Sequence, residues 1–322
     1  MNKKITQSMS IMQKENNMTT ENNLLLNFND EIDASKIEDI LLYIKEDLHE
    51  HIKLSASSLK QYLACPRSFL YNKILKPKPT HPSYHWGWFG TMVHNSIYYS
   101  FADFVDGEWI YKNGDIRSFE DVVDFYNKYF NGNFTEHPVL EQINAYEGIS
   151  EEEFVFFVDS KNERTNIYNE GINLIESGIS LVKKLINLGI KNVEIEKEIL
   201  FKPKTFNVLG YIDLKFEING NVYFFDFKTS KSPLKGDQLK EDLQFFLYSL
   251  YLKQNYPKKK VSGFLVHLRS RRAFRHILDK NIEEQNLKKI EMIEKEILNR
   301  NFPQNFGPLC RYCEFRGYCN IK

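Results

Sequence analysis

The chain has 322 residues, 42% of them hydrophobic and 14% aromatic, which suffices for one large domain or two small ones with a buried core. Basic and acidic residues balance at 43 each, so a nucleic-acid partner would need a local basic surface rather than an overall positive charge. We find no apolar run near the roughly 20 residues that span a bilayer, and no pattern of a signal or transit peptide. We therefore expect a protein of a reducing compartment, the cytoplasm, without contact with a membrane.

The first 53 residues are expected to precede the main domain. Residues 1–30 are polar, rich in Asn and poor in aromatic residues, which predicts a disordered arm. Residues 31–53 are expected to contain an N-terminal helix, because apolar residues recur at helical spacing from Ile37 to Ile52. We assign the folded domain to residues 54–322.

Helices dominate the first half of this domain. Ser55 or Ser57 can cap a helix that runs through Leu63, and Pro66 opens a second helix at a position where its missing N–H costs nothing. Cys65 lies at the joint between the two. The longer helical patterns that follow cover Trp86–Phe104, Phe119–Phe130 and Arg164–Leu188. They predict a helical region over about residues 100–190.

A β-hairpin is predicted near the middle of the chain, and the other elements are expected to be organised around it. Tyr211–Glu217 alternates apolar and polar residues, Asn219-Gly220-Asn221 supplies a turn, and Val222–Phe227 is β-branched and aromatic. Further predicted elements precede and follow the hairpin: strands at Val193–Phe201 and Val261–Leu268, and helices at Asp237–Gln254 and Ile282–Leu298.

The hairpin brings charged residues together. Side chains on a strand alternate between faces, so Asp226 and Lys228 point to the same side, and Asp213 on the preceding strand can lie beside Asp226. Two carboxylates a few ångströms apart repel, and one would take up a proton unless a cation lies between them. Mg²⁺ or Mn²⁺ suits such oxygen ligands, and a lysine beside the ion suits the stabilisation of phosphate charge. The alternative is a half-exposed hairpin with a surface Asp–Lys pair.

Six short motifs stand in one order between residues 54 and 320: SASSLKQYLACPRSFLY, GTMVH, GYID, DFKTS, QFFLY and CRYC-x5-C. In that order they resemble the RecB-like, CRISPR-adaptation-type exonucleases of the PD-(D/E)XK nuclease superfamily, in the branch that contains iron–sulfur proteins. The resemblance implies an α/β fold with a mixed central sheet flanked by helices, a helical insertion and a C-terminal cysteine cluster. It also implies that Asp213, Asp226 and Lys228 are the catalytic acid pair and lysine.

The same resemblance implies further metal ligands. The histidine of the family's G-x-x-H helix corresponds to His94, which would bind one or two Mg²⁺ or Mn²⁺ ions together with Asp213 and Asp226. In isolation, a histidine on such a helix is more often packed in a core than bound to a metal. Glu196 or Glu198, on the strand before the hairpin, is a further candidate, and the sequence does not choose between them.

The resemblance also assigns the helix that follows the hairpin to the active site. Its Q-x-x-x-Y motif corresponds to Gln244 and Tyr248, which the family uses near the active site and the DNA. Their i,i+4 spacing places both on one helix face, and that face could be turned to the cleft. The alternative is an ordinary helix surface.

The chain has four cysteines: Cys65, Cys310, Cys313 and Cys319. In a large chain without secretory features they indicate metal binding rather than disulfides. Four thiolates suit either an iron–sulfur cluster or Zn²⁺. Family members with this spacing bind a [4Fe–4S] cluster, so the resemblance favours that cofactor over Zn²⁺. With either group bound, we expect the cysteines to staple the C-terminus onto the N-terminal helices and to hold the domain closed.

A basic segment runs from Tyr256 to His276 and contains no acidic residue. Its basic residues are Lys258, Lys259, Lys260, Arg269, Arg271, Arg272 and Arg275. Phe264 and Phe274 lie among them, which suits phosphate contacts and base stacking. The alternative is a solvated loop with scattered charge. Because no G-x-x-x-x-G-K-[ST] motif occurs, a separate helicase or other DNA-processing protein would have to open duplex DNA.

These observations predict a metal-dependent deoxyribonuclease, an exonuclease that hydrolyses phosphodiester bonds in single strands or at DNA ends, with a structural [4Fe–4S] cluster. The rival hypothesis is a nucleic-acid-binding or assembly module that keeps the fold without cutting. A sequence-specific endonuclease would need a reader domain that we do not find. The sequence does not distinguish DNA repair, CRISPR adaptation and phage replication as the pathway.

Overall fold

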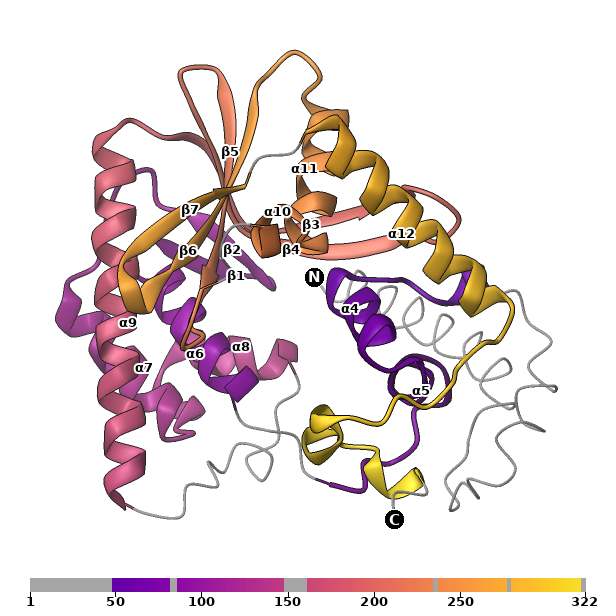
Figure 1. The fold of residues 1–322 in the computed structure, drawn as a ribbon. Helices are drawn as coiled ribbons and strands as arrows, with labels where there is room; N and C mark the ends of the chain where they lie inside the picture. Colours follow the sequence, from indigo (N-terminus) through magenta and orange to yellow (C-terminus); the bar gives the residue numbers. More distant parts are fainter. Residues whose placement is uncertain (1–47, 82–85, 148–160, 234–236, 277–278, 320–322) are drawn as a thin grey trace, which may run out of the picture. The chain divides into compact units, whose positions relative to one another are not determined.

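The computed structural model describes residues 48–81, 86–147, 161–233, 237–276 and 279–319 (Figure 1). The chain divides into two compact units. The larger unit comprises residues 49–60 and 84–295, and the smaller unit includes residues 61–83 and 296–322. The predicted arm and most of the predicted helix Ile37–Ile52 lie outside the described residues, and helix α3, Leu48–His51, covers the end of that prediction.

A five-stranded sheet forms the centre of the larger unit. Its strands lie in the order β3-β4-β5-β6-β7, where β5 and β6 are parallel and the other neighbours are antiparallel. The strands are β3, Lys191–Phe201; β4, Val208–Ile218; β5, Asn221–Lys228; β6, Val261–His267; and β7, Arg272–His276. The prediction of an α/β fold with a mixed central sheet is confirmed.

Strands β4 and β5 form the predicted hairpin. Asn219 and Gly220 have φ angles of 51° and 76°, the left-handed values that a two-residue type I′ turn requires. Ile218 pairs with Asn221 directly beside this turn. The Asn-Gly dipeptide therefore fixes the register of the two strands that carry Asp213 and Asp226.

Helices cover both faces of the sheet, as Figure 1 shows for α9 and α11. Helices α6, Trp86–Tyr99, α7, Phe119–Phe130, and α9, Lys161–Asn187, pack on one face, and α10, Asp237–Lys240, and α11, Leu243–Asn255, pack on the other. Phe225 and Phe227 join the core of the first face, whereas Phe224 joins the core of the second. Strand alternation therefore places Asp226 and Lys228 on the side of α11.

Close packing holds helix α6 in place. A Cβ atom at Gly178 of α9 would lie 2.4 Å from Cδ1 of Ile97, which is too short for two carbon atoms. Gly178 therefore lets α9 approach α6 at a distance that no larger residue would allow. Because α6 carries His94, this contact fixes one side of the candidate site.

The helix predicted over Trp86–Phe104 is wrong in its second part, because α6 ends at Tyr99. A second hairpin follows, made of β1, Ala102–Val105, and β2, Glu108–Tyr111. Its turn, Asp106-Gly107, has φ angles of 51° and 87°, again the type I′ combination. The Asp-Gly signal for a hairpin thus outweighs the helical spacing of the apolar residues around it.

The single helix predicted over Asp237–Gln254 is also divided, into α10 and α11. The carboxylate of Asp242 accepts hydrogen bonds from the N–H groups of Gln244, at 2.9 Å, and Phe245, at 3.2 Å. Asp242 is therefore the N-cap of α11, a position that Asp favours over a helix interior. Further helical elements described in the larger unit are the 3₁₀ helices Phe134–Glu136 and Leu268–Ser270, and α8, Pro138–Glu147.

The smaller unit consists of short helices and turns. After α4, Ala56–Ala64, the chain forms α5, Pro66–Phe69, and a π-helix, Leu70–Leu75; after α12, Lys280–Leu298, it forms 3₁₀ helices at Pro308–Tyr312 and Arg316–Tyr318. The division between the units falls within α4 and α12. Ser55 caps α4, because its Oγ accepts from the N–H of Ser58 at 3.1 Å and Ser58 Oγ accepts from the N–H of Ser55 at 2.7 Å.

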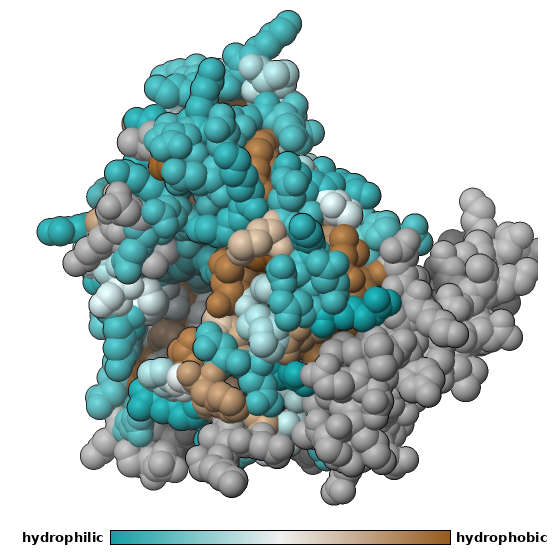
Figure 2. All heavy atoms as spheres, turned by 45° about the vertical axis from the view of Figure 1, so that its right-hand side comes forward, coloured by the Kyte–Doolittle hydropathy of each residue, from teal (hydrophilic) through white to brown (hydrophobic). Residues whose placement is uncertain are grey.

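Figure 2 shows hydrophilic side chains over most of the described surface turned to the viewer, with smaller hydrophobic areas among them. None of the described helices is long and apolar enough to cross a membrane.

Candidate active site

Asp213 and Asp226 lie opposite each other on the central hairpin. Leu214 pairs with Phe225 across β4 and β5, so Asp213 and Asp226 are the next opposed residues along the two strands. Both side chains are buried, with Asp213 7% and Asp226 1% exposed. Oδ2 of Asp213 accepts a hydrogen bond from the N–H of Phe227 at 2.6 Å. The structure thus brings together the two carboxylates that the sequence singles out.

Lys228 and Gln244 contact Asp226 from two sides. Nζ of Lys228 lies 2.7 Å from Oδ2 of Asp226, and Nε2 of Gln244 donates a hydrogen bond to Oδ1 at 2.8 Å. Nζ of Lys228 also donates to Oε1 of Gln244 at 3.1 Å. The three side chains therefore form a closed triangle that fixes the ammonium group of Lys228.

Tyr248 lies one turn after Gln244 on α11, and its hydroxyl is hydrogen-bonded to other residues of the protein. Its hydroxyl donates to the carbonyl oxygen of Tyr211 at 2.5 Å and accepts from Nε2 of Gln244 at 3.1 Å. Tyr248 is buried, and a Cβ atom at Gly210 would lie only 3.0 Å from its ring. Gln244 and Tyr248 thus share one helix face, as their spacing predicts, and that face supports Asp226 and β4.

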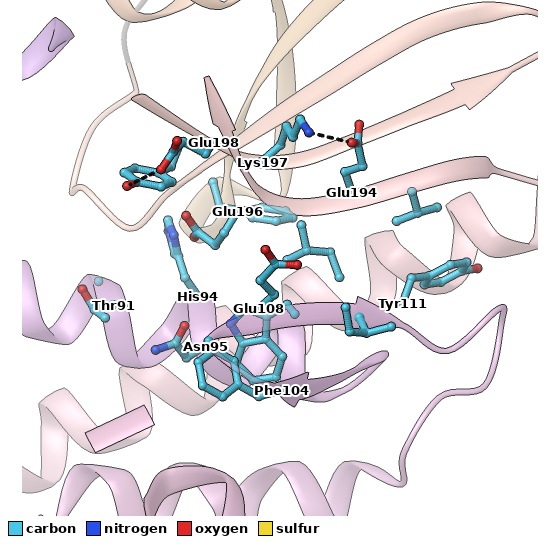
Figure 3. Close-up of a pocket in the computed structure, with 18 of the residues that line it drawn as sticks. Thr91, His94, Asn95, Phe104, Glu108, Tyr111, Glu194, Glu196, Lys197 and Glu198 are labelled. Atoms are coloured by element: carbon cyan, nitrogen blue, oxygen red, sulfur yellow. Dashed lines mark hydrogen bonds and ion pairs between the residues drawn. The ribbon is translucent and has the colours of Figure 1, made fainter. Parts of the chain in front are cut away.

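His94, Glu196 and Asp213 form a compact group that we call the ligand group. One nitrogen or oxygen atom from each of the three lies within 4.8 Å of the others, and Nδ1 of His94 is 3.6 Å from Oδ2 of Asp213. The three side chains come from α6, β3 and β4. Figure 3 shows the carboxylate of Glu196 directed toward the ring of His94.

The backbone of β3 distinguishes Glu196 from Glu198. Glu196 has a φ angle of 48°, a left-handed value that is uncommon for a residue with a side chain and that interrupts the regular strand geometry. Glu198 instead accepts a hydrogen bond from the hydroxyl of Tyr211 at 3.1 Å (Figure 3). A regular strand would place both glutamates on one face. The pairing of β3 with β4, in which Ile195 lies opposite Leu214 and Glu198 opposite Tyr211, places Glu196 rather than Glu198 beside Asp213.

Burial and like charge make this group unfavourable when it is fully ionised. Burial, together with the charges of Asp226 and Glu196, raises the pKa of Asp213 well above its usual value. Burial also raises the pKa of Asp226, although Lys228 opposes this shift. Burial and the nearby Lys228 lower the pKa of His94 to about 3, so its imidazole is neutral near pH 7.

This electrostatic balance fits a bound cation. Neutral imidazole and carboxylate oxygens are ligands that Mn²⁺ accepts, and Mg²⁺ binds chiefly through carboxylates and waters. A divalent ion between Glu196 and Asp213 would offset the repulsion that raises the pKa of Asp213. The donor atoms of the ligand group therefore suit the kind of ion that the sequence predicts.

The ligand group opens into a cavity of about 1550 Å³. His94, Glu196 and Lys228 line the cavity, whereas Gln244 and Tyr248 do not. Residues of β3 form one wall, and residues of hairpin β1–β2 form another (Figure 3). The cavity gives a large substrate access to the ligand group and to the ammonium of Lys228.

In the smaller unit, all four cysteines line one cavity of about 370 Å³. Burial raises the pKa of the Cys319 thiol to about 11, and the proximity of Cys313, Cys65 and Cys310 adds to the shift. The thiols are therefore close enough to repel one another as thiolates. A cationic group among them would reverse this repulsion.

The two segments that contribute the cysteines are joined by hydrogen bonds within the smaller unit. Nε of Arg67 donates to the carbonyl of Phe302 at 2.8 Å, and Oγ1 of Thr80 donates to the carbonyl of Glu314 at 2.9 Å. The hydroxyl of Tyr62 donates to the carbonyl of Asn301 at 2.6 Å. The approach of Cys65 to the C-terminal cysteines is therefore supported by the surrounding backbone.

In the folded protein, ion pairs neutralise several basic residues of the basic segment. Lys259 forms an ion pair with Glu217 at 2.6 Å, Arg269 pairs with Glu170 of α9, and Arg271 pairs with Glu176 of α9 at 2.6 Å. Exposed basic residues of the segment are Lys258, Lys260, Arg271, Arg272 and Arg275. Acidic residues from β4 and α9, remote in sequence, thus neutralise part of the predicted patch.

Comparison with known proteins identifies the class to which this fold and site belong. Residues 53–320 match the family model of the PD-(D/E)XK nuclease superfamily. The chain belongs to this superfamily, whose members are usually nucleases that hydrolyse phosphodiester bonds and typically use Mg²⁺ or Mn²⁺. No curated protein matches the chain.

Solved structures also match the chain. One, titled "Crystal structure of SSO0001", is 21% identical, covers 49% of this chain and 74% of its own, and superimposes with a TM-score of 0.30. At that score the likeness carries no argument about this chain.

Proposed function

We propose that this protein is a Mg²⁺- or Mn²⁺-dependent deoxyribonuclease of the RecB-like branch, an exonuclease that acts on single strands or DNA ends. One observation carries the proposal: the ligand group, His94, Glu196 and Asp213, stands beside Asp226 and Lys228, and His94, Glu196 and Lys228 line a large cavity. A buried carboxylate next to a fixed ammonium group, open to substrate, is suited to stabilising charge on a phosphodiester.

His94, Glu196, Asp213 and Asp226 would hold the metal. When bound, a divalent ion neutralises phosphate charge and lowers the pKa of water, which makes hydroxide available near neutral pH. Lys228 orients the attacking water and stabilises the charge that develops on the phosphate oxygens. Gln244 holds the ammonium of Lys228 and the carboxylate of Asp226 in fixed positions through one hydrogen bond with each.

Tyr248 acts through Gln244 in this scheme. Its hydroxyl connects the side chain of Gln244 to the backbone of β4 at Tyr211. It therefore positions the catalytic groups rather than contacting the DNA strand. This assignment refines the role that the family resemblance gives to the Q-x-x-x-Y helix.

The four cysteines are proposed to hold a structural [4Fe–4S] cluster. A single zinc ion on four thiolates needs sulfur atoms about 3.8 Å apart, because Zn–S bonds are about 2.3 Å long and tetrahedral. The cavity of about 370 Å³ that all four cysteines line has room for a group larger than one ion, which supports a cluster.

The rival function is a nucleic-acid-binding or assembly module that keeps the nuclease fold without cutting. The intact set of Asp213, Asp226 and Lys228, with the contacts that fix it, favours the nuclease. A separate helicase or other DNA-processing protein remains the proposed partner for duplex substrates. The exposed basic residues after β6, such as Arg272, are proposed to contact the DNA backbone.

Purified protein incubated with end-labelled single- and double-stranded DNA tests this function. We expect cleavage with Mg²⁺ or Mn²⁺, none with EDTA, and faster cleavage of single strands and free ends than of circular duplex. Products shortened stepwise from a labelled end identify an exonuclease. Binding without cleavage under every metal condition would favour the rival module.

A further inference from the structure

Hairpin β1–β2 forms a wall of the active-site cavity that the proposed mechanism does not use. Glu108, Ile110 and Tyr111 of β2 line the same cavity as His94 and Lys228. Strand β2 also lies against β3, the edge strand of the central sheet. Figure 3 shows Glu108 of this hairpin reaching toward Glu196. A DNA strand bound at the ligand group would therefore lie beside the hairpin.

The hairpin is held rigidly to helix α6. Trp109 is buried and packs edge-on against Tyr98 at 5.9 Å, and Tyr98 in turn packs against the ring of His94 at 6.1 Å. Arg117 donates a hydrogen bond to the carbonyl of Ala102 at 2.6 Å, pairs with Asp103 of β1, and stacks over the ring of Tyr99 at 4.1 Å. The wall and the histidine of the ligand group are thus parts of one packed body.

The face that the hairpin presents combines apolar and acidic side chains. Ile110 is 50% exposed, although it lines the cavity, and Glu108 lies on the same face of β2 two residues away. Across the cavity, β3 contributes Glu194, Glu196 and Glu198. Phosphate groups would be repelled by these carboxylates and attracted to Lys228 and a bound cation. The base is the part of a nucleotide that offers a flat apolar face to Ile110, because the phosphate is charged and the sugar is polar.

We propose that hairpin β1–β2 is a base-binding wall that makes the site selective for unpaired DNA, with Ile110 as the specificity-determining residue. The inference rests on the proposed function, because it takes the same cavity as the substrate site. The bases of an intact duplex are stacked and paired, so this wall cannot contact their faces. In a single strand the bases are free to pack against an apolar side chain such as that of Ile110.

The test measures base-dependent binding by the full chain. Fluorescence anisotropy in Ca²⁺, chosen to limit cleavage, compares an oligothymidine strand with an abasic strand of equal length and charge. Wild-type protein should bind the oligothymidine about five-fold more tightly, which corresponds to about 1 kcal/mol. Ile110→Ala should lose most of that ratio and leave the affinity for the abasic strand unchanged. Ile110→Phe should keep the ratio or increase it.

Val105→Ala is the matched control. Val105 is 49% exposed on the same hairpin face but does not line the cavity, so this variant should behave like wild type. The proposal is overturned if wild-type protein binds both strands equally, if Ile110→Ala retains the wild-type ratio, or if Val105→Ala loses the ratio to the same extent. Cleavage in Mg²⁺ is measured separately: wild-type protein that binds bases selectively but never cuts contradicts the nuclease proposal and supports the base-binding wall.

Discussion

Among single residues, Glu196 combines an uncommon backbone angle with a place in the ligand group. Alternation along β3 places Glu194, Glu196 and Glu198 on one face, so the sequence leaves the choice between Glu196 and Glu198 open. The structure resolves this choice: Glu196 lies opposite Asp213 in the pairing of β3 with β4, has a left-handed φ of 48°, and joins His94 and Asp213 in the ligand group. Such strain is maintained by the surrounding fold and is common at functional sites. Asp213, Asp226 and Lys228 were predictable because the strands that carry them follow the regular alternation.

Substitution of glutamine for each glutamate in turn distinguishes the role of Glu196 from that of Glu198. Glu196→Gln should weaken Mn²⁺ binding about ten-fold or more, because even groups that only support metal ligands have effects of that size. Without metal, the same variant should unfold at the wild-type temperature or higher, since it removes a charge that repels the carboxylate of Asp213. Calorimetric titration with Mn²⁺ and thermal unfolding in EDTA measure both effects.

Glu198→Gln provides the matched control for this prediction. Glu198 is exposed and hydrogen-bonded to Tyr211, so its variant should bind Mn²⁺ like wild type. Equal losses of affinity in the two variants would place the ion elsewhere on β3. Unchanged affinity in Glu196→Gln would remove Glu196 from the ligand group.

At the scale of elements, the start of helix α11 couples stability to the active site. Asp242 caps the helix and also forms an ion pair with Lys60 at 2.7 Å. Gln244, which touches both Asp226 and Lys228, lies in the first turn after that cap. A frayed first turn would therefore release the side chain that aligns Asp226 and Lys228, the proposed catalytic pair.

Substitution of the cap tests this coupling. Asp242→Ala should lower the free energy of unfolding by about 0.5–2 kcal/mol, the usual range for loss of an N-cap. It should also reduce the rate of DNA cleavage, because Gln244 loses its fixed position. Asp242→Asn keeps a capping oxygen and should restore most of the stability. Denaturant unfolding and single-turnover cleavage measure the two effects; full activity in Asp242→Ala would show that Gln244 does not depend on the cap.

The elements that the sequence predicts poorly are those where a local signal competes with periodicity. The apolar spacing from Trp86 continues past the end of α6, and the Asp106-Gly107 turn converts its continuation into hairpin β1–β2. Asp242 similarly divides a continuous apolar stripe by capping α11. The turn and the cap are both present in the sequence, but their effect depends on tertiary contacts such as the hydrogen bond from Arg117 to the carbonyl of Ala102 in β1. The central hairpin was predictable because its turn and its alternation agree.

At the scale of the whole chain, the cysteine cavity joins segments that are far apart in sequence. Cys65 lies 245 residues before Cys310. By analogy with disulfides, closure of such a long loop removes about 4–5 kcal/mol of chain entropy from the unfolded state. A domain is typically stable by only about 5–15 kcal/mol. A cluster on these thiolates would thus contribute a large share of the stability of the fold.

We predict that anaerobically purified protein is brown and contains iron and sulfide near four per chain. Cys65→Ala should lose the colour, melt at a lower temperature and be cut more readily by trypsin near the C-terminal cysteines. Cleavage of DNA should decrease as a consequence of the lost structure. Colourless protein with stoichiometric zinc would refute the iron–sulfur assignment. A Cys65→Ala protein with full colour and an unchanged melting temperature would refute the prediction that the cysteines join the C-terminus to the N-terminal helices.

The central claim concerns the buried carboxylate beside Lys228, and the most direct test is the rate of single-strand cleavage as a function of Mn²⁺ concentration. Asp226→Asn keeps the volume of the side chain, so it should fold, bind DNA through contacts elsewhere, and cleave about a hundred-fold or more slowly at every Mn²⁺ concentration. Asp124→Asn, which alters only an exposed pair with Lys128, should match wild type. Cleavage by Asp226→Asn at the wild-type rate, with the same dependence on Mn²⁺, would contradict the active-site assignment.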